Sequence, residues 1–150
     1  MITKLIRPVF EPHKITSPYG ERIIWGKKQF HDGIDYVNKN NDQRVRAIAD
    51  GVIVLDVDYY IHKLRWSDNR HSAGNFVILK HSIHGKDYFV RYMHLKENYV
   101  SKSDKVKQGT VLGEYANVGK STGPHVHIDM YNQSWVKLDL TPILIKGLTI

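Results

Sequence analysis

The chain has 150 residues, enough for one domain with a single core, and its lack of cysteine excludes disulfides and thiolate metal ligands. With 41% hydrophobic and 25% charged residues and no apolar run of membrane-spanning length, it is neither disordered, fibrous nor membrane-inserted. A formal charge of +7 favours an anionic partner, either nucleic acid or an acid-decorated cell wall, and charge alone does not choose between them.

The first 30 residues are expected to form extended segments joined by turns, because prolines and glycines interrupt any helical pattern there. Residues 5–10 are a candidate peripheral strand. The same stretch lacks the uninterrupted apolar segment and the small-residue cleavage site of a secretory signal. No signal peptide is therefore expected.

Two hairpins are expected in the middle of the chain. In the first, Asp50 and Gly51 form a turn signal between two apolar runs within residues 45–56. In the second, residues 75–81 and 86–94 are rich in β-branched and aromatic side chains and flank a turn that contains Gly85.

Short strands with glycine turns continue through residues 106–113 and 126–135, and no segment has a convincing helical period. We therefore expect a mainly β fold, either a sandwich or a barrel, forming a single domain over residues 1–150. Residues 56–74 form an unusually long connection that carries aromatic and cationic side chains. This loop could wall a substrate groove or simply pack against the sheet.

Four of the nine histidines gather in three short blocks that could hold a metal. His125 and His127 alternate with apolar residues, so on a strand both imidazoles project from one face. His31 and Asp35 are four residues apart and also share a face, and the nearby glycine favours extended structure. A catalytic zinc needs three protein ligands and one open position, which a His-Asp pair and one later histidine would supply.

A lone histidine is more commonly a packed or solvated residue than a ligand, and four histidines are interpreted in this way. These are His13, His62, His71 and His84.

Taken together, the blocks resemble the lysostaphin-like (M23, LytM-type) zinc metallopeptidases. The shared motifs are His-x-x-x-Asp at residues 31–35, His-Leu at 94–95 and Ser-Thr-Gly-Pro-His-x-His at 121–127. Framework similarity extends over about residues 15–131. The resemblance implies a small antiparallel β fold of the barrel-sandwich hybrid type, with the zinc site at one end of a groove.

The resemblance also implies roles for individual residues. One Zn²⁺ per chain would be bound by His31, Asp35 and His127. His94 and His125 would be the two catalytic histidines, with His125 as the general base and His94 as the donor to the oxyanion, although these two roles could be exchanged.

Weaker expectations concern neighbouring positions. Tyr92 and Asn75 are candidate substrate contacts. Tyr92 would share a strand face with His94 if that strand is regular, but a plain core or surface tyrosine is the favoured alternative. His81 is interpreted as structural. Asp129 stands where the family usually has Glu, a departure that touches no proposed ligand.

The function implied by the resemblance is zinc-dependent hydrolysis of peptide bonds in bacterial peptidoglycan, in the stem peptide or the cross-bridge. A non-catalytic wall-binding or amidase-regulating relative is the alternative, but such proteins usually lose ligands and all five site residues are present here. Nucleic acid is not an expected partner, because nucleic-acid binding would account for the positive charge but not for the ordered His and Asp motifs. The oligomeric state cannot be read from the sequence.

The absence of a visible signal peptide is compatible with a phage-type lysin. Such an enzyme is made in the cytoplasm and acts on the wall after lysis or as part of a virion. A domain excised from a secreted protein is equally compatible.

Overall fold

A computed structural model describes residues 4–58, 73–117 and 123–145 of the chain. These residues form short antiparallel strands and one helical turn, as the prediction of a mainly β fold required. The strands are β1 (His13–Ser17), β2 (Gly20–Ile24), β3 (Lys27–His31), β4 (Ile34–Asn38), β5 (Arg44–Arg46), β6 (Gly51–Val57), β7 (Asn75–Ile83), β8 (Lys86–Asn98), β9 (Lys105–Val106), β10 (Val111–Tyr115), β11 (Val126–Tyr131) and β12 (Lys137–Leu138). A five-residue π-helical turn, η1 (Thr141–Ile145), follows the last strand.

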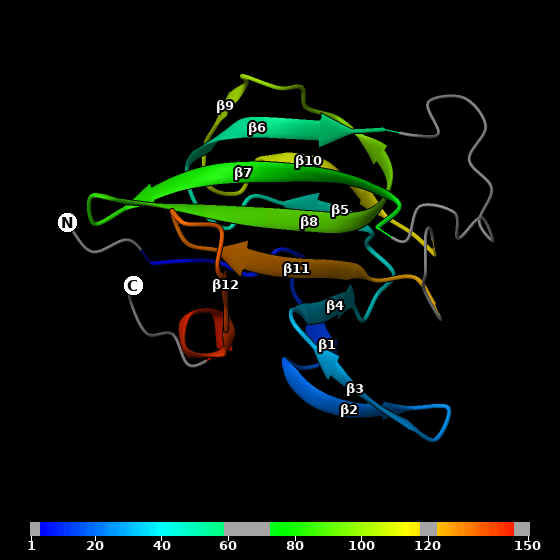
Figure 1. Cartoon of the computed structure of the whole chain (residues 1–150). Coiled ribbons are helices and arrows are strands. Elements are labelled where there is room, and N and C mark those ends of the chain that lie inside the picture. The colour runs from blue at the N-terminus through cyan, green and yellow to red at the C-terminus, as the bar shows by residue number, and fades with distance from the viewer. Residues whose placement is uncertain (1–3, 59–72, 118–122, 146–150) are drawn as a thin grey trace.

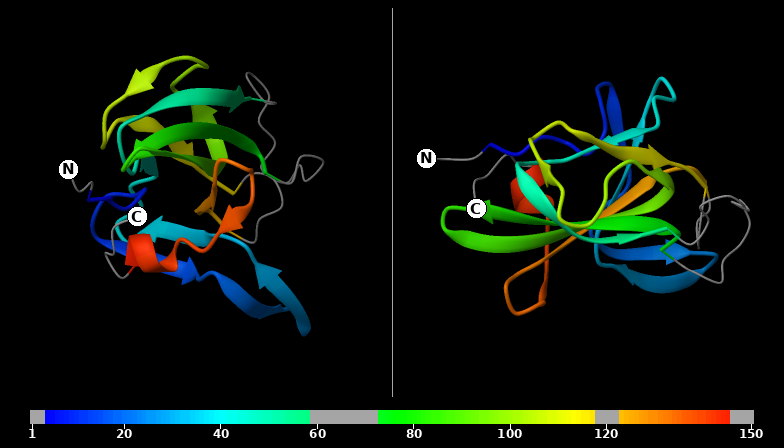
Figure 2. Two further views of the ribbon diagram at one scale, coloured as in Figure 1. Left: turned by 60° about the vertical axis from the view of Figure 1, so that its left-hand side comes forward. Right: turned by 90° about the horizontal axis from the view of Figure 1, so that it is seen from above.

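One large sheet has the strand order β1-β4-β11-β8-β7-β6-β9, with β12 beside β11 and with β10 pairing both β5 and β8. Figure 1 shows the long strands β6, β7, β8 and β11 side by side, with β5 and β10 behind them. The sheet curls around the core (Figure 2). A separate two-stranded ribbon, β2–β3, projects beyond β4 and β1 (Figure 1).

Alternating side chains on β11 explain how one strand serves both the core and a polar face. Val126, Ile128 and Met130 point into the core, whereas the intervening His127 and Asp129 point to the opposite face. In the core, these residues meet apolar side chains from other strands of the curled sheet. The largest members of the core are Tyr36, Tyr92, Tyr115, Ile34, Ile48, Ile53, Leu79, Ile83, Leu95, Leu112, Ile128 and Met130.

The predicted hairpin at residues 75–94 is confirmed, since β7 pairs β8 through a turn at His84 and Gly85. Both turn residues have positive φ, 52° and 76°, as a two-residue hairpin turn requires.

The predicted hairpin at Asp50-Gly51 is wrong. β5 pairs β10, and β6 pairs β7 and β9 instead. Gly51 is needed for close packing, because a Cβ there would lie 2.7 Å from both His81 Nδ1 and the Lys80 carbonyl oxygen.

Residues 5–10 do not form the expected strand. They are joined to the segment around β5 by a bridge between Val9 and Val45 and by backbone hydrogen bonds from the Ile6 amide to the Ile48 carbonyl oxygen and from the Arg46 amide to the Pro8 carbonyl oxygen. Most of the long connection at residues 56–74 lies outside the described residues. No described helix is long and apolar enough to cross a membrane.

His81 is buried in the core as a neutral imidazole. Its Nδ1–H donates to the Asp50 carbonyl oxygen at 2.8 Å, and its Nε2 lies 3.3 Å from the Tyr92 hydroxyl, which also accepts from the Ile48 amide. Burial lowers the pKa of His81 to about 4, because the charged form loses its hydration. This agrees with a structural role for His81.

Acid is therefore expected to destabilise the fold through His81. The unfolded chain protonates this residue near pH 6.5 and the folded chain near pH 4, so the unfolded state binds more protons between these values. The contribution of His81 to the free energy of unfolding is fully present above pH 6.5. About 3 kcal/mol of this contribution is lost as the pH falls from 6.5 to about 4. Denaturant unfolding at several pH values measures this, and the His81→Gln variant, which retains a donor and an acceptor, is expected to show a shallower dependence. Equal slopes in both proteins would contradict it.

Candidate metal centre

Three strands bring His31, Asp35 and His127 together. His31 ends β3, Asp35 is the second residue of β4, and His127 is the second residue of β11, directly opposite Asp35 in the β4–β11 pairing. His31 and Asp35 therefore do not lie on one face of a single strand, as their spacing suggested. The chain leaves the ribbon after His31 and enters the large sheet at β4, which turns the two side chains toward each other.

The donor atoms of these residues form a compact triangle. His31 Nε2 lies 3.0 Å from His127 Nδ1 and 3.3 Å from Asp35 Oδ1, and the third side, from His127 Nδ1 to Asp35 Oδ1, is 2.9 Å. A tetrahedral zinc ion with ligands at about 2.0–2.1 Å separates any two ligand atoms by about 3.3 Å. The triangle thus has nearly the size of one face of such a tetrahedron, and the residues present fit a zinc ion.

Outer hydrogen bonds fix the orientation of both imidazoles. His31 Nδ1–H donates to the Pro18 carbonyl oxygen at 2.9 Å. His127 Nε2–H donates to Asp129 Oδ2 at 3.2 Å. The remaining nitrogen of each ring therefore directs its lone pair into the triangle, in the arrangement typical of metal-ligating histidines.

The triangle places three acceptor atoms face to face, which is unfavourable unless a cation lies among them. In the metal-free chain, burial alone would raise the pKa of Asp35, but hydrogen bonds from the protonated rings of His127 and His31 and the nearby His125 hold it well below its usual range. In the metal-free chain, burial alone would lower the pKa of His127, but hydrogen bonds from its protonated ring to Asp129 and Asp35 raise it to about 8, so a metal ion would have to displace the Nδ1 proton. The site therefore favours positive charge at its centre.

His125 and His94 lie next to the triangle. His125 Nδ1–H donates to the Gly123 carbonyl oxygen at 2.8 Å, which leaves Nε2 facing Asp35 Oδ1 at 3.6 Å. The ring of His94 is centred 4.7 Å from that of His125 and 6.3 Å from that of His127. Burial lowers the pKa of His125 despite the opposing charge of Asp35, so this imidazole is neutral at pH 7 and able to accept a proton.

A β-bulge directs His94 into the site. Between the paired positions Asn75–Val77 on β7 and Leu95–Tyr92 on β8, β8 has one extra residue, and His94 has a φ of 63°. The bulge breaks the alternation that would have put Tyr92 and His94 on one face.

Tyr92 is accordingly a core residue. Its side chain is fully buried, and its hydroxyl accepts from the Ile48 amide at 3.0 Å. Asn75 is also fully buried, and its Nδ2 donates to the Lys96 carbonyl oxygen at 3.1 Å. Burial of both side chains agrees with the core alternative for Tyr92, and contact of either residue with substrate stays a prediction.

The sequence did not assign a role to the ionic network behind His127. Asp129 is fully buried and accepts from His127, from Arg91 Nη2 at 2.7 Å and from Lys137 Nζ at 3.2 Å, and Lys137 also donates to Asp32 at 2.8 Å. Because residues 127 and 129 alternate on one strand, a His-x-Asp pattern was the available signal. The pKa of Asp129 is depressed by His127 and Arg91, against the effect of burial, so the carboxylate stays ionised and holds His127 in place.

Asp32, His127 and Asp129 form a second cluster of potential metal ligands. We favour the first triangle for a metal, because the Lys137 ammonium already lies between the two carboxylates of the second cluster. His127 Nε2 also carries its proton on that side.

Gly33 is expected to be essential for the position of His127. A Cβ at this residue would lie 2.5 Å from both Cε1 and Nε2 of His127 and 2.6 Å from the Ile128 carbonyl oxygen. In Gly33→Ala the imidazole must shift, and we expect metal affinity to fall about 10- to 100-fold, as when an outer partner is lost. Competition with a chelator measures the affinity. Gly123→Ala is the matched control, since no atom of the described residues lies within 4 Å of a Cβ placed there, and equal affinities of the two variants would contradict the expectation.

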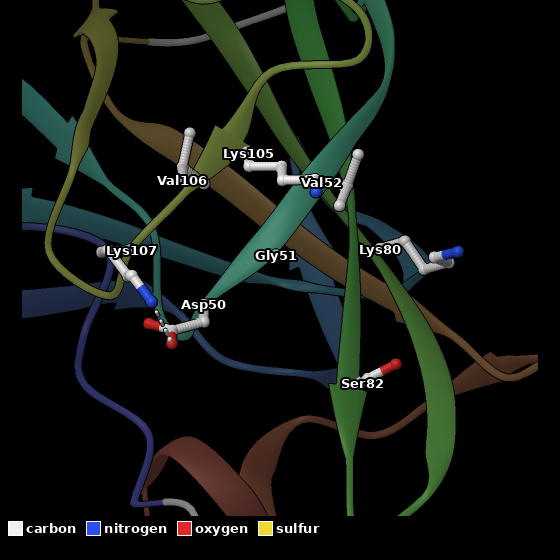
Figure 3. A pocket seen from close by; sticks show the side chains of 8 residues that line it. All are labelled: Asp50, Gly51, Val52, Lys80, Ser82, Lys105, Val106 and Lys107. Carbon is white, nitrogen blue, oxygen red and sulfur yellow. Dashed lines mark ion pairs between the residues drawn. The ribbon is translucent and has the colours of Figure 1, made fainter.

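A pocket of about 360 Å³ lies elsewhere, at the junction of β6, β7 and β9 (Figure 3). Its lining includes three lysines, Lys80, Lys105 and Lys107, and Lys107 pairs with Asp50 at 3.7 Å. None of the five predicted site residues lines it. Its lysines contribute to the basic surface of the chain. The side chains that line the pocket do not indicate a catalytic function.

Comparison with known proteins agrees with this geometry. The chain is 33% identical over 121 residues to the peptidoglycan DD-endopeptidase ShyA of Vibrio cholerae, which covers 81% of this chain and 23% of ShyA. It is 28% identical to the catalytic domain of the antimicrobial peptidase lysostaphin from Staphylococcus simulans, with a TM-score of 0.63 over 87% of this chain and 90% of that domain. A zinc-containing peptidase from Vibrio cholerae shares the fold, with a TM-score of 0.68, 23% identity and coverage of 92% of this chain and 39% of that one.

The chain spans only 23% to 30% of the length of the first curated relatives that it matches. The sequence profile of Peptidase family M23 matches residues 29–139, which is most of the chain. This match confirms the resemblance drawn from the motifs, and the fold is the lysostaphin-like one that was expected. The chain belongs to Peptidase family M23.

Proposed function

We propose that this chain is a zinc-dependent endopeptidase that hydrolyses peptide bonds in bacterial peptidoglycan. The observation that carries the proposal is the triangle of His31, Asp35 and His127, whose three acceptor atoms face one another at 2.9–3.3 Å. Family membership and the names of ShyA and lysostaphin support the reaction class. The zinc-containing neighbour supports the choice of metal.

In this proposal His31, Asp35 and His127 hold one zinc ion. When bound, zinc supplies Lewis-acid chemistry, polarising the scissile carbonyl and lowering the pKa of a water molecule toward 7. The protein has to hold the three donor atoms and to keep both imidazoles in the correct tautomer. The Pro18 carbonyl oxygen and the Asp129 carboxylate perform this second task.

His125 is proposed as the general base. Its Nδ1–H donates to the Gly123 carbonyl oxygen, so in the neutral ring the acceptor nitrogen is Nε2, which faces the site. It would take a proton from the attacking water and return one to the leaving amine. His94, beside it, would donate to the oxyanion that forms on the scissile carbonyl, a type of contact worth about 3–4 kcal/mol. The two roles could be exchanged.

The proposed substrate is the peptide part of peptidoglycan, in the stem or the cross-bridge, and a phage-type lysin is the proposed setting. The formal charge of +7 and the lysine-lined pocket suit an anionic cell wall. A non-catalytic relative is disfavoured because the described structure gathers all five site residues in one place.

The test is digestion of purified sacculi by the zinc-loaded protein, with and without a chelator, followed by mass spectrometry of the released fragments. New amino termini that need zinc and disappear in His125→Ala are expected, and the fragments identify the bond. His84→Asn is the matched control, because this exposed turn residue has a φ of 52°, which asparagine tolerates. Zinc binding without cleavage of sacculi of several peptide types would favour the non-catalytic alternative, and failure to bind zinc would refute the proposal.

A further inference from the structure

Three aromatic side chains gather on the face of the sheet that carries His127 and Asp129. Phe89 on β8 and Tyr131 on β11 are cross-strand partners, and Trp135 comes from the loop between β11 and β12. Trp135 stacks on Phe89 with the ring centres 4.2 Å apart and the planes at 18°, and it lies 5.5 Å from the ring of Tyr131. We refer to these three residues as the aromatic platform.

The aromatic platform remains open to solvent. Trp135 is 51% exposed although it is one of the largest apolar side chains, and Phe89 and Tyr131 are half-buried. The loop that carries it stands out from the sheet (Figure 2, right). Packing within the chain therefore uses only part of the ring surface, and a flat apolar surface is left for a ligand.

The loop holds Trp135 in a fixed position. Asn132 Oδ1 accepts from the amides of Ser134 at 2.9 Å and Val136 at 3.0 Å, and the Trp135 amide donates to the Asn132 carbonyl oxygen at 3.0 Å. Trp135 itself has a φ of 59°, a conformation that bulky residues rarely adopt. A strained backbone that is held by three hydrogen bonds presents the ring in advance of binding, which reduces the entropic cost of capturing a ligand.

Charged groups border the aromatic platform and connect it to the candidate metal centre. The Arg91 guanidinium carbon and Lys137 Nζ lie 5.9 Å and 4.9 Å from the centre of the Tyr131 ring. Both cations also bind Asp129, which accepts from the proposed ligand His127. The distance along β11 from His127 to Tyr131 is about 13 Å, at about 3.3 Å per residue.

From these features we propose that the aromatic platform binds the glycan strand of peptidoglycan, by stacking of an N-acetylhexosamine ring on Trp135. A pyranose ring has an apolar face of C–H groups and a border of hydroxyl and acetamido groups. Such a ligand matches a flat aromatic surface that is bordered by hydrogen-bonding side chains. A small alanine side chain of a stem peptide would need a concave pocket, and a charged stem residue would pair with ions.

The inference rests on the proposed function, because the sugar belongs to the same substrate. A stem peptide is attached to its glycan strand, so a sugar must lie within one stem length of the bond that is cut. The position of the aromatic platform, on the face of the metal centre and a short distance from it, meets this condition. Trp135 would thus act in substrate binding and not in the chemical step.

The first test is a titration of the zinc-loaded chain with the trisaccharide of N-acetylglucosamine. Binding is monitored by nuclear magnetic resonance at millimolar sugar. Trp135→Asn is expected to weaken binding about tenfold, by loss of the stacking contact. Trp25→Asn is the matched control, because Trp25 is also an exposed tryptophan, 82% accessible, with a φ of 50° at the tip of the β2–β3 ribbon. Asparagine tolerates positive φ at both positions. Absence of binding to the wild type, or equal binding by the two variants, overturns the proposal.

The second test separates this inference from the proposed function. Trp135→Asn is expected to lower kcat/KM on intact sacculi about tenfold and to leave cleavage of a glycan-free cross-linked peptide unchanged. Equal losses on both substrates would assign the aromatic platform to peptide binding and overturn the glycan proposal. Because the trisaccharide titration needs no catalysis, a chain that binds sugar but cuts nothing would refute the proposed function alone.

Discussion

Substitution of Asp35 by asparagine is expected to release the bound metal and to abolish measurable peptidase activity. Asp35 Oδ1 lies 2.9 Å from His127 Nδ1 and 3.3 Å from His31 Nε2, so it supplies the only negative charge among the three proposed donor atoms. An amide oxygen of similar shape has no charge with which to balance the cation. The loss of kcat/KM is expected to exceed the roughly 10- to 100-fold typical of losing an outer partner.

The comparison with Asp129→Asn makes this result specific. Asp129 touches His127 on the side away from the triangle, so its substitution is expected to cost only about 10- to 100-fold in metal affinity. Zinc content is measured by inductively coupled plasma mass spectrometry, and kcat/KM is measured on a soluble peptide. Both are expected to be highest in the wild type, lower in Asp129→Asn and lowest in Asp35→Asn. Full zinc occupancy in Asp35→Asn would show that another set of residues binds the metal.

Loss of the His125 imidazole is expected to lower kcat by about 10²- to 10⁴-fold while zinc stays bound. His125 approaches Asp35 at 3.6 Å but is not one of the three donors of the triangle, so metal affinity does not depend on it directly. His125→Ala therefore separates catalysis from metal binding, which no substitution of a proposed ligand can do. The measurement is kcat of the zinc-loaded variant together with its zinc content.

The pH dependence identifies the general base. A base works in its neutral form, so kcat/KM should fall as the pH decreases through its pKa, which burial keeps below 6.5 for His125. His94→Gln should keep this acidic limb, whereas the residual activity of His125→Gln should lack it. The opposite pattern would exchange the roles assigned to the two histidines.

The sequence predicted local features well, because they depend on neighbouring residues. Alternation along residues 126–131 placed His127 on a face opposite to the apolar side chains, and Gly85 predicted the β7–β8 turn. The motifs at residues 31–35, 94–95 and 121–127 indicated the family that the profile match confirms. Residues 121 and 122 of the last motif lie outside the described part of the chain.

Pairing between distant segments could not be predicted in this way. Asp50-Gly51 has the composition of a hairpin turn, but β6 pairs β7, where Gly51 makes room for His81. Composition describes what a segment can do locally, and the partner that it selects depends on side chains far away in the chain.

By itself, then, the sequence determined the mainly β class and the family, and it indicated the five residues that are proposed to carry the chemistry. Only the tertiary structure decided how they meet, because His31 and Asp35 come from different sheets and His94 reaches the site through a bulge that sends Tyr92 into the core. Bulges and strand register are set by contacts across the sheet, and no local pattern reports them. The same holds for the network of Asp129, Arg91 and Lys137, whose members become neighbours only when β8, β11 and β12 pair.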